Sequence, residues 1–549
     1  MRLDALWHDR SKIFRRDARR ARNRIQETLL STASPLRSTI DVPALLAALP
    51  ARISDIPALA AGRDPQHVAL IEDGRRLTNA QLVQAVEATA ALLHDWGVRG
   101  GDRVMIVAEN SIAQIVLLFA TARLDAWALV SNARLSASEL DAIRAHAQPR
   151  VTAYAVESSV DAGQHAQRHR ASTAPDVAPG IGAWSYTVDT SAQAEPVEAA
   201  NDRQCAALIY TTGTTGAPKG VMLSHRNLLF IAAASSRLRQ VRPDDVVYAV
   251  LPISHVYGFA SVCLGSLYAG ATLRLAPRFA PEGVRRALAD ERVSIFQGVP
   301  AMHAKLIEHL QTRGHPWRAP HLRFIYSGGS PLDAALKAHV ESVYGLPLHN
   351  GYGMTESSPT VSQTMLDAPR RDCSVGEVIP GVEVRFVGLD GADVAVGETG
   401  ELWVRGPNVM LGYYRNPQQT RAAVTQDGWL KTGDLARQDA DGALHIVGRS
   451  KDLIIRSGFN VYPAEVEHVL NAHPQVVQSA VIGRPVEGNE EVIAFVELAA
   501  NASVTPAELV AWCVERLAPY KRPAEVKVLA ALPAASTGKI LKHRLREFL

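Results

Sequence analysis

The 549-residue chain has few cysteines, few aromatic side chains and no large excess of charge. The four cysteines stand far apart, without the paired spacing of a zinc site or a disulfide framework, so we expect reduced thiols and a cytoplasmic protein. The formal net charge of +3 gives no reason to expect nucleic acid as a partner. No uninterrupted apolar run reaches the length of a membrane-spanning helix. The remaining composition, 47% hydrophobic and 21% charged, is typical of a globular protein.

The N-terminal segment departs from this balance. Up to Arg24 it contains nine basic side chains and three aspartates, with apolar residues at roughly helical spacing. Such a segment fits a membrane-surface helix or a solvated extension, and the extension fits better. The aspartates count against an organelle presequence. We therefore expect a basic extension over residues 1–50, with at most a weak contact to a membrane surface.

A loop rich in glycine and threonine, Tyr210–Gly220, is the most informative feature that is present. It follows the apolar run Ala206–Ile209, and a helical pattern begins at Ser224. A strand, such a loop and a helix hold phosphates well, because glycines allow close backbone approach and a helix N-terminus attracts anions. The loop is not a Walker A motif, since Gly220 follows Lys219 where a hydroxyl residue is required, which counts against a GTPase or a motor ATPase. Alone, it fits a flexible surface turn about equally well.

Hydrophobic patterning divides the rest of the chain. Over residues 65–150 and 205–350, apolar runs alternate with helical patterns, which predicts a mostly parallel, helix-covered sheet. Residues 157–204 lack periodicity, so we expect a long surface connection there. Short runs over 380–448 predict antiparallel strands, and the last hundred residues predict a compact α+β unit. Within these regions we expect strands at 103–107, 246–251, 271–275, 294–299, 324–327, 477–482 and 492–498, and helices that begin near Thr78, Pro463 and Thr505 and span 301–310 and 331–344.

Four further motifs contain residue types that nucleotide chemistry needs, although each alone also fits an ordinary turn or linker. Gly351–Glu356 places an aromatic ring between glycines and a hydroxyl beside a carboxylate, which suits a planar base and Mg²⁺. Asp434 is a turn carboxylate that can accept two hydroxyl groups. Gly448–Asp452 lies where the pattern changes, as a hinge does. Ser536–Lys539 places a lysine on a loop near the C-terminus.

In this order and spacing, the motifs resemble those of the adenylate-forming superfamily, which includes acyl-CoA synthetases, aryl-CoA ligases, peptide-synthetase adenylation domains and beetle luciferases. The resemblance begins near residue 50 and reaches the C-terminus. It also covers Leu251–Gly258, Ser327–Leu332 and Gly448–Glu467. Within the superfamily, Ser457–Pro463 looks most like fatty acyl-CoA ligases.

The resemblance implies an α/β fold. A large adenylation domain over 51–449 would combine mostly parallel, helix-covered sheets with a small distorted β-barrel. A small, mobile α+β domain would follow over 450–549. It also implies two half-reactions, in which ATP and Mg²⁺ convert a carboxylic acid to acyl-AMP and pyrophosphate, and a thiol such as CoA then releases AMP.

Roles carry over from the family residue by residue. The nucleotide and its phosphates are assigned to Thr211, Thr212, Gly213, Thr214, Thr215, Gly216, Lys219, Gly328, Gly329, Ser330, Tyr352, Asp434 and Arg449. Thr355 would contact the α-phosphate, Glu356 would bind Mg²⁺, and Lys539 would bridge the carboxylate and the α-phosphate. Lys451 takes the hinge position. His255 matches a gate to the thiol tunnel, with a buried structural histidine as the alternative, and the loop at Gly458 would reach that tunnel.

The acyl pocket is expected, again by analogy, to be apolar or small and to contain no charged group. Its predicted residues are Tyr257, Phe259, Ser261, Gly298, Ser327, Gly351, Met354 and Val361. An amino-acid substrate would need a buried acid and a dicarboxylate an extra arginine, so we expect a fatty or aromatic monocarboxylic acid, with fatty favoured. Two alternatives remain open, an enzyme that loads a phosphopantetheine carrier protein and a catalytically silent binding protein, of which the second fits less well. Oligomeric state is not predicted.

Overall fold

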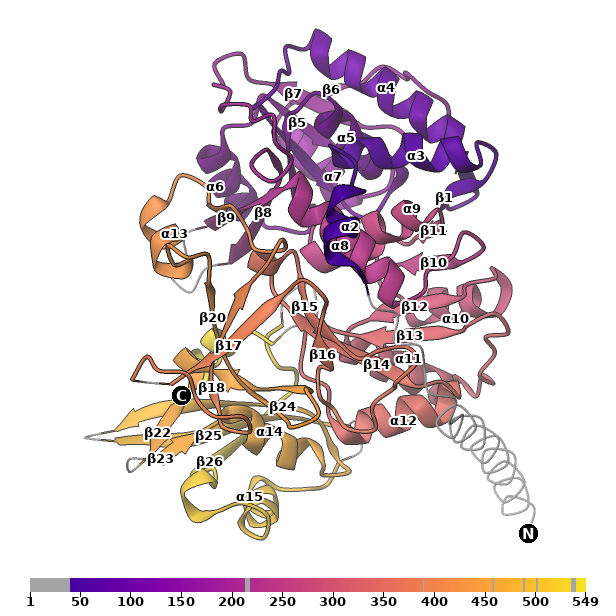
Figure 1. Cartoon of the computed structure of the whole chain (residues 1–549). Coiled ribbons are helices and arrows are strands. Elements are labelled where there is room, and N and C mark those ends of the chain that lie inside the picture. Colours follow the sequence, from indigo (N-terminus) through magenta and orange to yellow (C-terminus); the bar gives the residue numbers. More distant parts are fainter. Residues whose placement is uncertain are drawn as a thin grey trace, which may run out of the picture.

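The computed structural model describes residues 40–549 except 213–217, 389, 457–458, 487–488, 500–501 and 535–539. Over these residues the strands form five sheets (Figure 1). The predictions for the N-terminal extension up to residue 39, and for Gly213, Thr214, Thr215, Gly216, Gly458 and Lys539, lie outside the described residues.

An eight-stranded sheet occupies the upper part of Figure 1, in the order β19-β9-β8-β4-β3-β5-β7-β6. Its parallel centre consists of β3 (Arg103–Ala108), β4 (Trp127–Asn132), β5 (Val151–Tyr154) and β8 (Cys205–Thr212). All six residues of β3 are buried, as a strand covered on both faces requires. The helices beside the sheet are α4 (Asn79–Asp95), α5 (Ile112–Arg123) and α6 (Ala137–Ala147). The predicted cap of α4 is confirmed, because Thr78 and Gln81 bond to each other's backbone.

The prediction of a long surface connection over 157–204 is wrong in part. Helix α7 (Val160–Arg168) and strands β6 (Ser172–Thr173) and β7 (Ser185–Val188) form within it, and β7 pairs with β5. Short polar elements at a sheet edge lack the long apolar periodicity by which a sequence identifies a helix or strand.

The segment after the phosphate loop also differs from the prediction. Pro218–Ser224 form a strand, β9, that pairs antiparallel with β8, so the loop connects a hairpin and does not lead directly into a helix. Helix α8 (His225–Leu238) begins only after β9, with Ser224 as its N-cap. Val221 and Leu223 are buried in the sheet, and this burial stabilises an extended backbone there. The helix N-terminus therefore does not contribute to the loop's attraction for phosphate.

A nine-stranded sheet lies beside the first, in the order β16-β15-β14-β13-β12-β10-β11-β1-β2. The predicted strands are confirmed as β10 (Val246–Ala249), β11 (Thr272–Leu275), β12 (Ile295–Gly298) and β13 (Phe324–Ser327), and they are parallel, as is β14 (Leu348–Gly353). The predicted helices are α11 (Pro300–Arg313) and α12 (Ala334–Tyr344), which lie beside β12–β14 with α10 (Pro281–Asp290) (Figure 1). Two further strands at each end complete the sheet: β1 (Val68–Glu72), which is parallel to β11, with the edge strand β2 (Arg75–Thr78), and β15 (Thr360–Gln363) with the edge strand β16 (Glu377–Val378).

The part expected as a small barrel contains a four-stranded antiparallel sheet, β17 (Glu383–Val387), β18 (Gly400–Arg405), β20 (Leu430–Gln438) and β21 (Leu444–Arg449). After it, a smaller α+β unit lies at the bottom of Figure 1. Its elements are β22 (Ile454–Arg456), β23 (Phe459–Val461), α14 (Pro463–Asn471), β24 (Val476–Val486), β25 (Asn489–Leu498), α15 (Pro506–Val514) and β26 (Glu525–Leu529). This unit has apolar clusters of its own. In the described part of the chain, no helix combines the length and the apolarity that crossing a membrane requires.

Candidate active site

The parallel strands β13 and β14 bring two predicted segments to the same edge of the nine-stranded sheet. Ser327 lies opposite Asn350 in the register, so Gly328–Ser330, which follow β13, are neighbours of Gly351–Glu356, which form the end of β14 and the turn after it. A Cβ atom at Gly351 would lie 1.9 Å from the hydroxyl oxygen of Tyr326, which leaves room for glycine alone. The carboxyl ends of parallel strands are where open α/β sheets bind ligands.

Tyr352, Asp434 and Arg449 form a connected group at this edge. Asp434 and Arg449 face each other on β20 and β21, and Arg449 Nε donates to Asp434 Oδ1 at 3.0 Å. The Tyr352 hydroxyl donates to the other carboxylate oxygen of Asp434. Burial, and then the charge of Asp434, raise the pKa of Tyr352 well above its usual value, so its hydroxyl stays protonated. Because each carboxylate oxygen has two lone pairs, Asp434 can still accept hydroxyl groups of a ligand.

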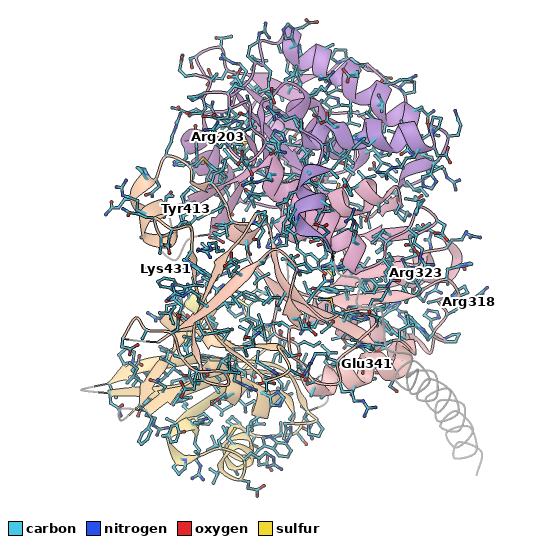
Figure 2. The ribbon with its side chains drawn as sticks, viewed as in Figure 1. Arg203, Arg318, Arg323, Glu341, Tyr413 and Lys431 are labelled. Carbon is cyan, nitrogen blue, oxygen red and sulfur yellow. The ribbon has the colours of Figure 1, made fainter. Side chains whose placement is uncertain are left out.

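Glu356 lies on a 3₁₀ turn, η3 (Thr355–Ser357), directly after β14. Its Oε1 accepts a hydrogen bond of 2.9 Å from the hydroxyl of Tyr413, a residue that no sequence motif singled out. Tyr413 is labelled in Figure 2 and lies on β19 (Gly412–Tyr413), which pairs with β9. The Lys219 ammonium lies 5.6 Å from the centre of the Tyr413 ring, so Lys219 and Glu356 share this tyrosine.

The Glu356 carboxylate fits one ligand position of Mg²⁺. It is a hard oxygen donor, and the bond from Tyr413 orients it while Oε2 remains available. Mg²⁺ normally keeps few protein ligands and takes its other oxygens from water and substrate phosphates. Thr355, beside it, is buried at the same turn.

Cationic groups gather on the other side of this region. Lys451 follows β21 on the turn η4 (Ser450–Asp452). Partial removal from water, followed by the charge of Arg449, lowers the pKa of Lys451, and Lys219 contributes in the same direction. Lys451 therefore lies close enough to Arg449 and Lys219 to be influenced by both charges, with Asp452 and Asp434 acting in the opposite direction, and such a group of cations suits a polyanionic ligand.

His255 lies on a turn that a buried asparagine holds in place. The Asn110 amide donates to the carbonyls of Ala249 and Leu251, both at 2.9 Å, and accepts from the Ile253 N–H at 2.8 Å. Asn110 was missed by the sequence analysis, because nothing in its own segment indicates this contact. The turn continues into a π-helix, η2 (Tyr257–Leu264), a form that is frequent at functional sites.

The predicted acyl residues are brought together only in part. Tyr257 lies against Gly328, where a Cβ atom would be 3.3 Å from its ring, and Ser261 Oγ lies 3.4 Å from Thr360 Oγ1. Phe259, Met354, Val361 and Tyr257 all pack in or against the main apolar core. None of these predicted residues is itself charged, but the buried Arg239, which no motif named, lies close enough to influence the Tyr257 hydroxyl electrostatically.

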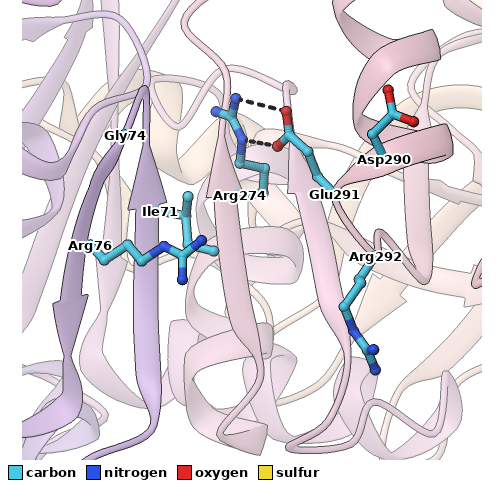
Figure 3. Close-up of a pocket in the computed structure, with 7 residues that line it drawn as sticks. All are labelled: Ile71, Gly74, Arg76, Arg274, Asp290, Glu291 and Arg292. Carbon is cyan, nitrogen blue, oxygen red and sulfur yellow. Dashed lines mark hydrogen bonds and ion pairs between the residues drawn. The ribbon is translucent and has the colours of Figure 1, made fainter.

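Two other groups of polar residues, one lining a pocket and one on the surface, do not suit the adenylation chemistry expected of the chain. A pocket of about 370 Å³ is bounded by β1, β2, β11 and the loop before β12, at the amino end of that strand, and its Arg274 is paired with Glu291 at 2.5 Å (Figure 3). On the surface, Glu282, His309 and His315 have ligand atoms within 4.8 Å of one another. Both oxygens of Glu282 already accept hydrogen bonds from Arg285, whose charge would compete with a metal ion.

Comparison with known proteins agrees with this site. Residues 58–414 match the model of the AMP-binding enzyme family, and residues 465–539 match the AMP-binding enzyme C-terminal domain. Indoleacetate–CoA ligase of Aromatoleum aromaticum is 36% identical over 495 residues, which are 89% of this chain and 96% of that protein. Feruloyl-CoA synthase of an Amycolatopsis species is 36% identical over 503 residues, 89% of this chain and 97% of its own.

Solved structures show the same relationship. ATP-bound MatB from Rhodopseudomonas palustris has a TM-score of 0.78 and 31% identity, and the match covers 90% of this chain and 98% of MatB. The two segments that match the family models and the fold that matches MatB therefore give the same family for most of the described chain. The chain belongs to the AMP-binding enzyme family of the adenylate-forming superfamily, and it is an AMP-forming acid–thiol ligase.

Proposed function

We propose that this chain is an ATP-dependent acyl-CoA ligase that acts on a fatty or aromatic monocarboxylic acid. The single observation that supports it most is the group formed by Tyr352, Asp434 and Arg449, which places a carboxylate for hydroxyl groups beside an aromatic ring at the end of β14. In the first half-reaction, a carboxylate oxygen attacks the α-phosphorus of ATP and the bond to pyrophosphate breaks. In the second, a thiolate sulfur attacks the acyl carbon and AMP leaves.

The nucleotide would lie along the edge of the nine-stranded sheet. Tyr352 would stack on adenine beside the Gly328–Ser330 backbone, and Asp434, oriented by Arg449, would accept both ribose hydroxyls. Because burial and Asp434 raise its pKa, the Tyr352 hydroxyl keeps its proton and remains a hydrogen-bond donor to Asp434. The same hydrogen bond therefore positions the ring and the carboxylate together.

Two sets of groups, the phosphate-loop side chains and the Mg²⁺ site at Glu356, would compensate the negative charge of the phosphates. Thr211, Thr212 and Lys219, with the loop residues Gly213–Gly216, would hold the β- and γ-phosphates, and Thr355 would contact the α-phosphate. Glu356 would hold Mg²⁺, which would compensate part of the phosphate charge when bound. The attacking carboxylate is already ionised and needs no base, so the chain's task is to bring two anions together and to stabilise the charge that develops.

The second half-reaction would require the C-terminal unit to move. We place a large domain over 51–449 and a small domain over 450–549. Lys451, near the start of the small domain, would be the hinge. Lys539 would bridge the reacting carboxylate and the α-phosphate in the adenylating arrangement. Rotation would withdraw it and bring the loop at Gly458 to the thiol tunnel, where His255 would act as the gate.

The names of similar proteins bear on the choice of acceptor, whereas the acid class was argued from the predicted pocket residues. Relatives such as indoleacetate–CoA ligase and feruloyl-CoA synthase are named for aromatic acids, and a long-chain-fatty-acid–CoA ligase of Yersinia pestis is 40% identical over 62% of this chain. These names support CoA as the acceptor in preference to a carrier protein.

Pyrophosphate exchange tests the proposal. Purified protein with Mg²⁺, ATP and labelled pyrophosphate is offered a panel of fatty and aromatic acids, and we expect label in ATP with a subset of them. Adding CoA or a phosphopantetheinylated carrier protein then identifies the acceptor through AMP release, which we expect with free CoA. The absence of exchange with every acid would contradict adenylation itself, and AMP release with the carrier alone would contradict the acceptor.

A further inference from the structure

Arg239 places a positive charge in the interior of the molecule. It is the first residue after α8 and is 2% exposed. Its Nη1 donates to Oε1 of Gln297 at 2.8 Å, and its Nε donates to Oε1 of Gln363 at 3.2 Å. In the part of the chain that the structure describes, no aspartate or glutamate forms an ion pair with it. The charge therefore has neutral amide partners in place of a counter-ion.

A buried guanidinium in such surroundings is unusual. It carries five N–H donors; the two amides take two of them, and the Tyr326 side chain is a further hydrogen-bond partner. The face of Tyr326, whose ring centre lies 4.4 Å from the guanidinium carbon, adds a cation–π contact. Neither the amides nor the ring carries a negative charge, and an unpaired buried charge is costly. An additional acceptor oxygen from a ligand would remove this deficit.

The position of Arg239 connects it with the proposed acyl site. Tyr326 packs its hydroxyl over Gly351, and its ring centre lies 6.1 Å from that of Tyr257. The Tyr326 ring thus separates Arg239 from the strand end where the nucleotide is proposed to bind. A group that extends from the reacting carboxylate past Tyr257 would approach the guanidinium.

A further buried polar atom beside Tyr326 lacks a partner. The Tyr257 hydroxyl is buried and makes no hydrogen bond with the described residues. Tyr257 as a whole is 7% exposed. Buried polar side chains are nearly always paired in folded proteins, so unpaired ones beside a binding site indicate that the ligand provides the partner.

We propose that Arg239 is a specificity-determining residue that binds an acceptor oxygen in the tail of the acid. The substrate class is an acid with a carbonyl or a second carboxylate remote from the reacting carboxylate, and an unsubstituted hydrocarbon tail gives Arg239 no anionic or carbonyl partner and leaves the Tyr257 hydroxyl unpaired. The inference rests on the proposed acyl-CoA ligase function; a keto acid would narrow the monocarboxylic class proposed above, and a dicarboxylic acid would replace it.

The test compares acids of equal length that differ only in the tail oxygen. Octanoate, 7-oxooctanoate and octanedioate form one such series, and shorter and longer series are measured in the same way, because the depth of the site is not assumed. The readout is kcat/KM for pyrophosphate exchange. We expect the wild-type protein to prefer an oxygenated member by on the order of 10²-fold, since a site built to hydrogen-bond rejects the analogue that lacks the partner. Comparison of the keto acid with the dicarboxylic acid shows whether the oxygen that Arg239 binds belongs to a ketone or to a second carboxylate.

Arg239→Met should remove this preference and leave exchange with hydrocarbon acids unchanged or increased. Arg237→Met is the matched control, because Arg237 lies two residues earlier on α8 and is exposed. An equal loss with all acids in Arg239→Met would show a structural role and overturn the proposal. Arg239→Lys, which keeps the charge, serves if thermal unfolding shows that the methionine variant does not fold.

The comparison of hydrocarbon and oxygenated acids with the wild-type protein tests the proposal without any variant. Exchange with hydrocarbon acids at least as good as with their oxygenated partners, at every length, would overturn the role of Arg239 and leave the acyl-CoA ligase function intact. Exchange with no acid at all would overturn the proposed function, and the role of Arg239 with it.

Discussion

The hydroxyl of Tyr413 donates a hydrogen bond of 2.9 Å to the carboxylate of Glu356, although 57 positions separate the two residues in the chain. The contact exists because β19 pairs with β9, which carries Lys219, while Glu356 follows β14 of the other large sheet. It therefore connects the phosphate-loop hairpin with the proposed Mg²⁺ ligand, and it supports the first of four predictions.

Tyr413→Phe should raise the Mg²⁺ concentration needed for half-maximal pyrophosphate exchange by about 3- to 10-fold. The change removes one hydrogen bond to the Glu356 carboxylate, worth about 1.5 kcal/mol at the low end for a charged acceptor, and keeps the ring beside Lys219. Tyr414→Phe is the matched control, because that hydroxyl binds Glu195 at 2.6 Å instead. Equal Mg²⁺ requirements in the two variants would contradict the orienting role.

Asp434→Ala should mainly weaken ATP binding, with a rise in KM for ATP of about 10- to 100-fold, since bonds to a charged group are each worth about 1.5–3 kcal/mol. Asp439→Ala serves as the control, because Asp439 lies on the turn between the same two strands and pairs with His445 at 2.8 Å. An unchanged KM for ATP in the Asp434 variant would argue against the ribose role.

Lys539→Ala should reduce adenylation by at least on the order of 10²-fold, by analogy with the loss of one charge-stabilising donor. Thioester formation from supplied acyl-AMP should be largely spared, so the two half-reactions are measured separately. Lys542→Ala provides a nearby control, because Lys542 is held by Glu467 at 2.6 Å. Equal losses in both half-reactions would contradict the exchange of two arrangements about Lys451.

His303 should make stability depend on pH. Burial lowers the pKa of His303 from 6.5 to about 4, so the folded protein holds this ring neutral, with Nε2 within 3.2 Å of the Tyr326 carbonyl oxygen. Because the folded pKa is the lower one, the stabilisation is complete above pH 6.5 and is lost as pH falls from 6.5 towards 4. At pH 5 the loss should be about 2 kcal/mol.

The measurement is the free energy of unfolding by denaturant at pH 7.5 and at pH 5. In His303→Gln the difference between the two values should shrink by about 2 kcal/mol relative to the wild type. His94→Gln, a change at an exposed position on α4, should leave the difference unaltered. A difference that stays the same in His303→Gln would show that other groups cause the pH dependence.

Much of the fold could be predicted because it is encoded locally. Alternating apolar patterns identified β10 to β13, and Thr78, Thr505 and Pro463 marked helix starts that the structure confirms. The errors have a common cause. β9 was overlooked because glycine, proline and lysine at its start indicate a loop, while pairing with β8 and burial of Val221 stabilise a strand.

The candidate site could be predicted only where the family's motifs name its members. Asp434, Tyr352 and Arg449 were predicted individually, and the structure brings them together. Tyr413 and Asn110 were missed, since each lies in a segment without a motif and acts on residues far away in the sequence. The role that we propose for Arg239 depends in the same way on Gln297 and Gln363, the latter 124 positions away.

By itself, the sequence determined the family, the order of the motifs, the local helices and strands and the chemistry expected of each motif, because residue type and short spacing encode all of these. Only the tertiary structure decided that the phosphate loop connects a hairpin, that Tyr413 orients Glu356, and that a guanidinium with no carboxylate partner among the described residues lies beside the predicted acyl residue Tyr257. The physical reason is that strand pairing and burial join segments that are distant in the chain, and the free energy of those contacts has no local pattern.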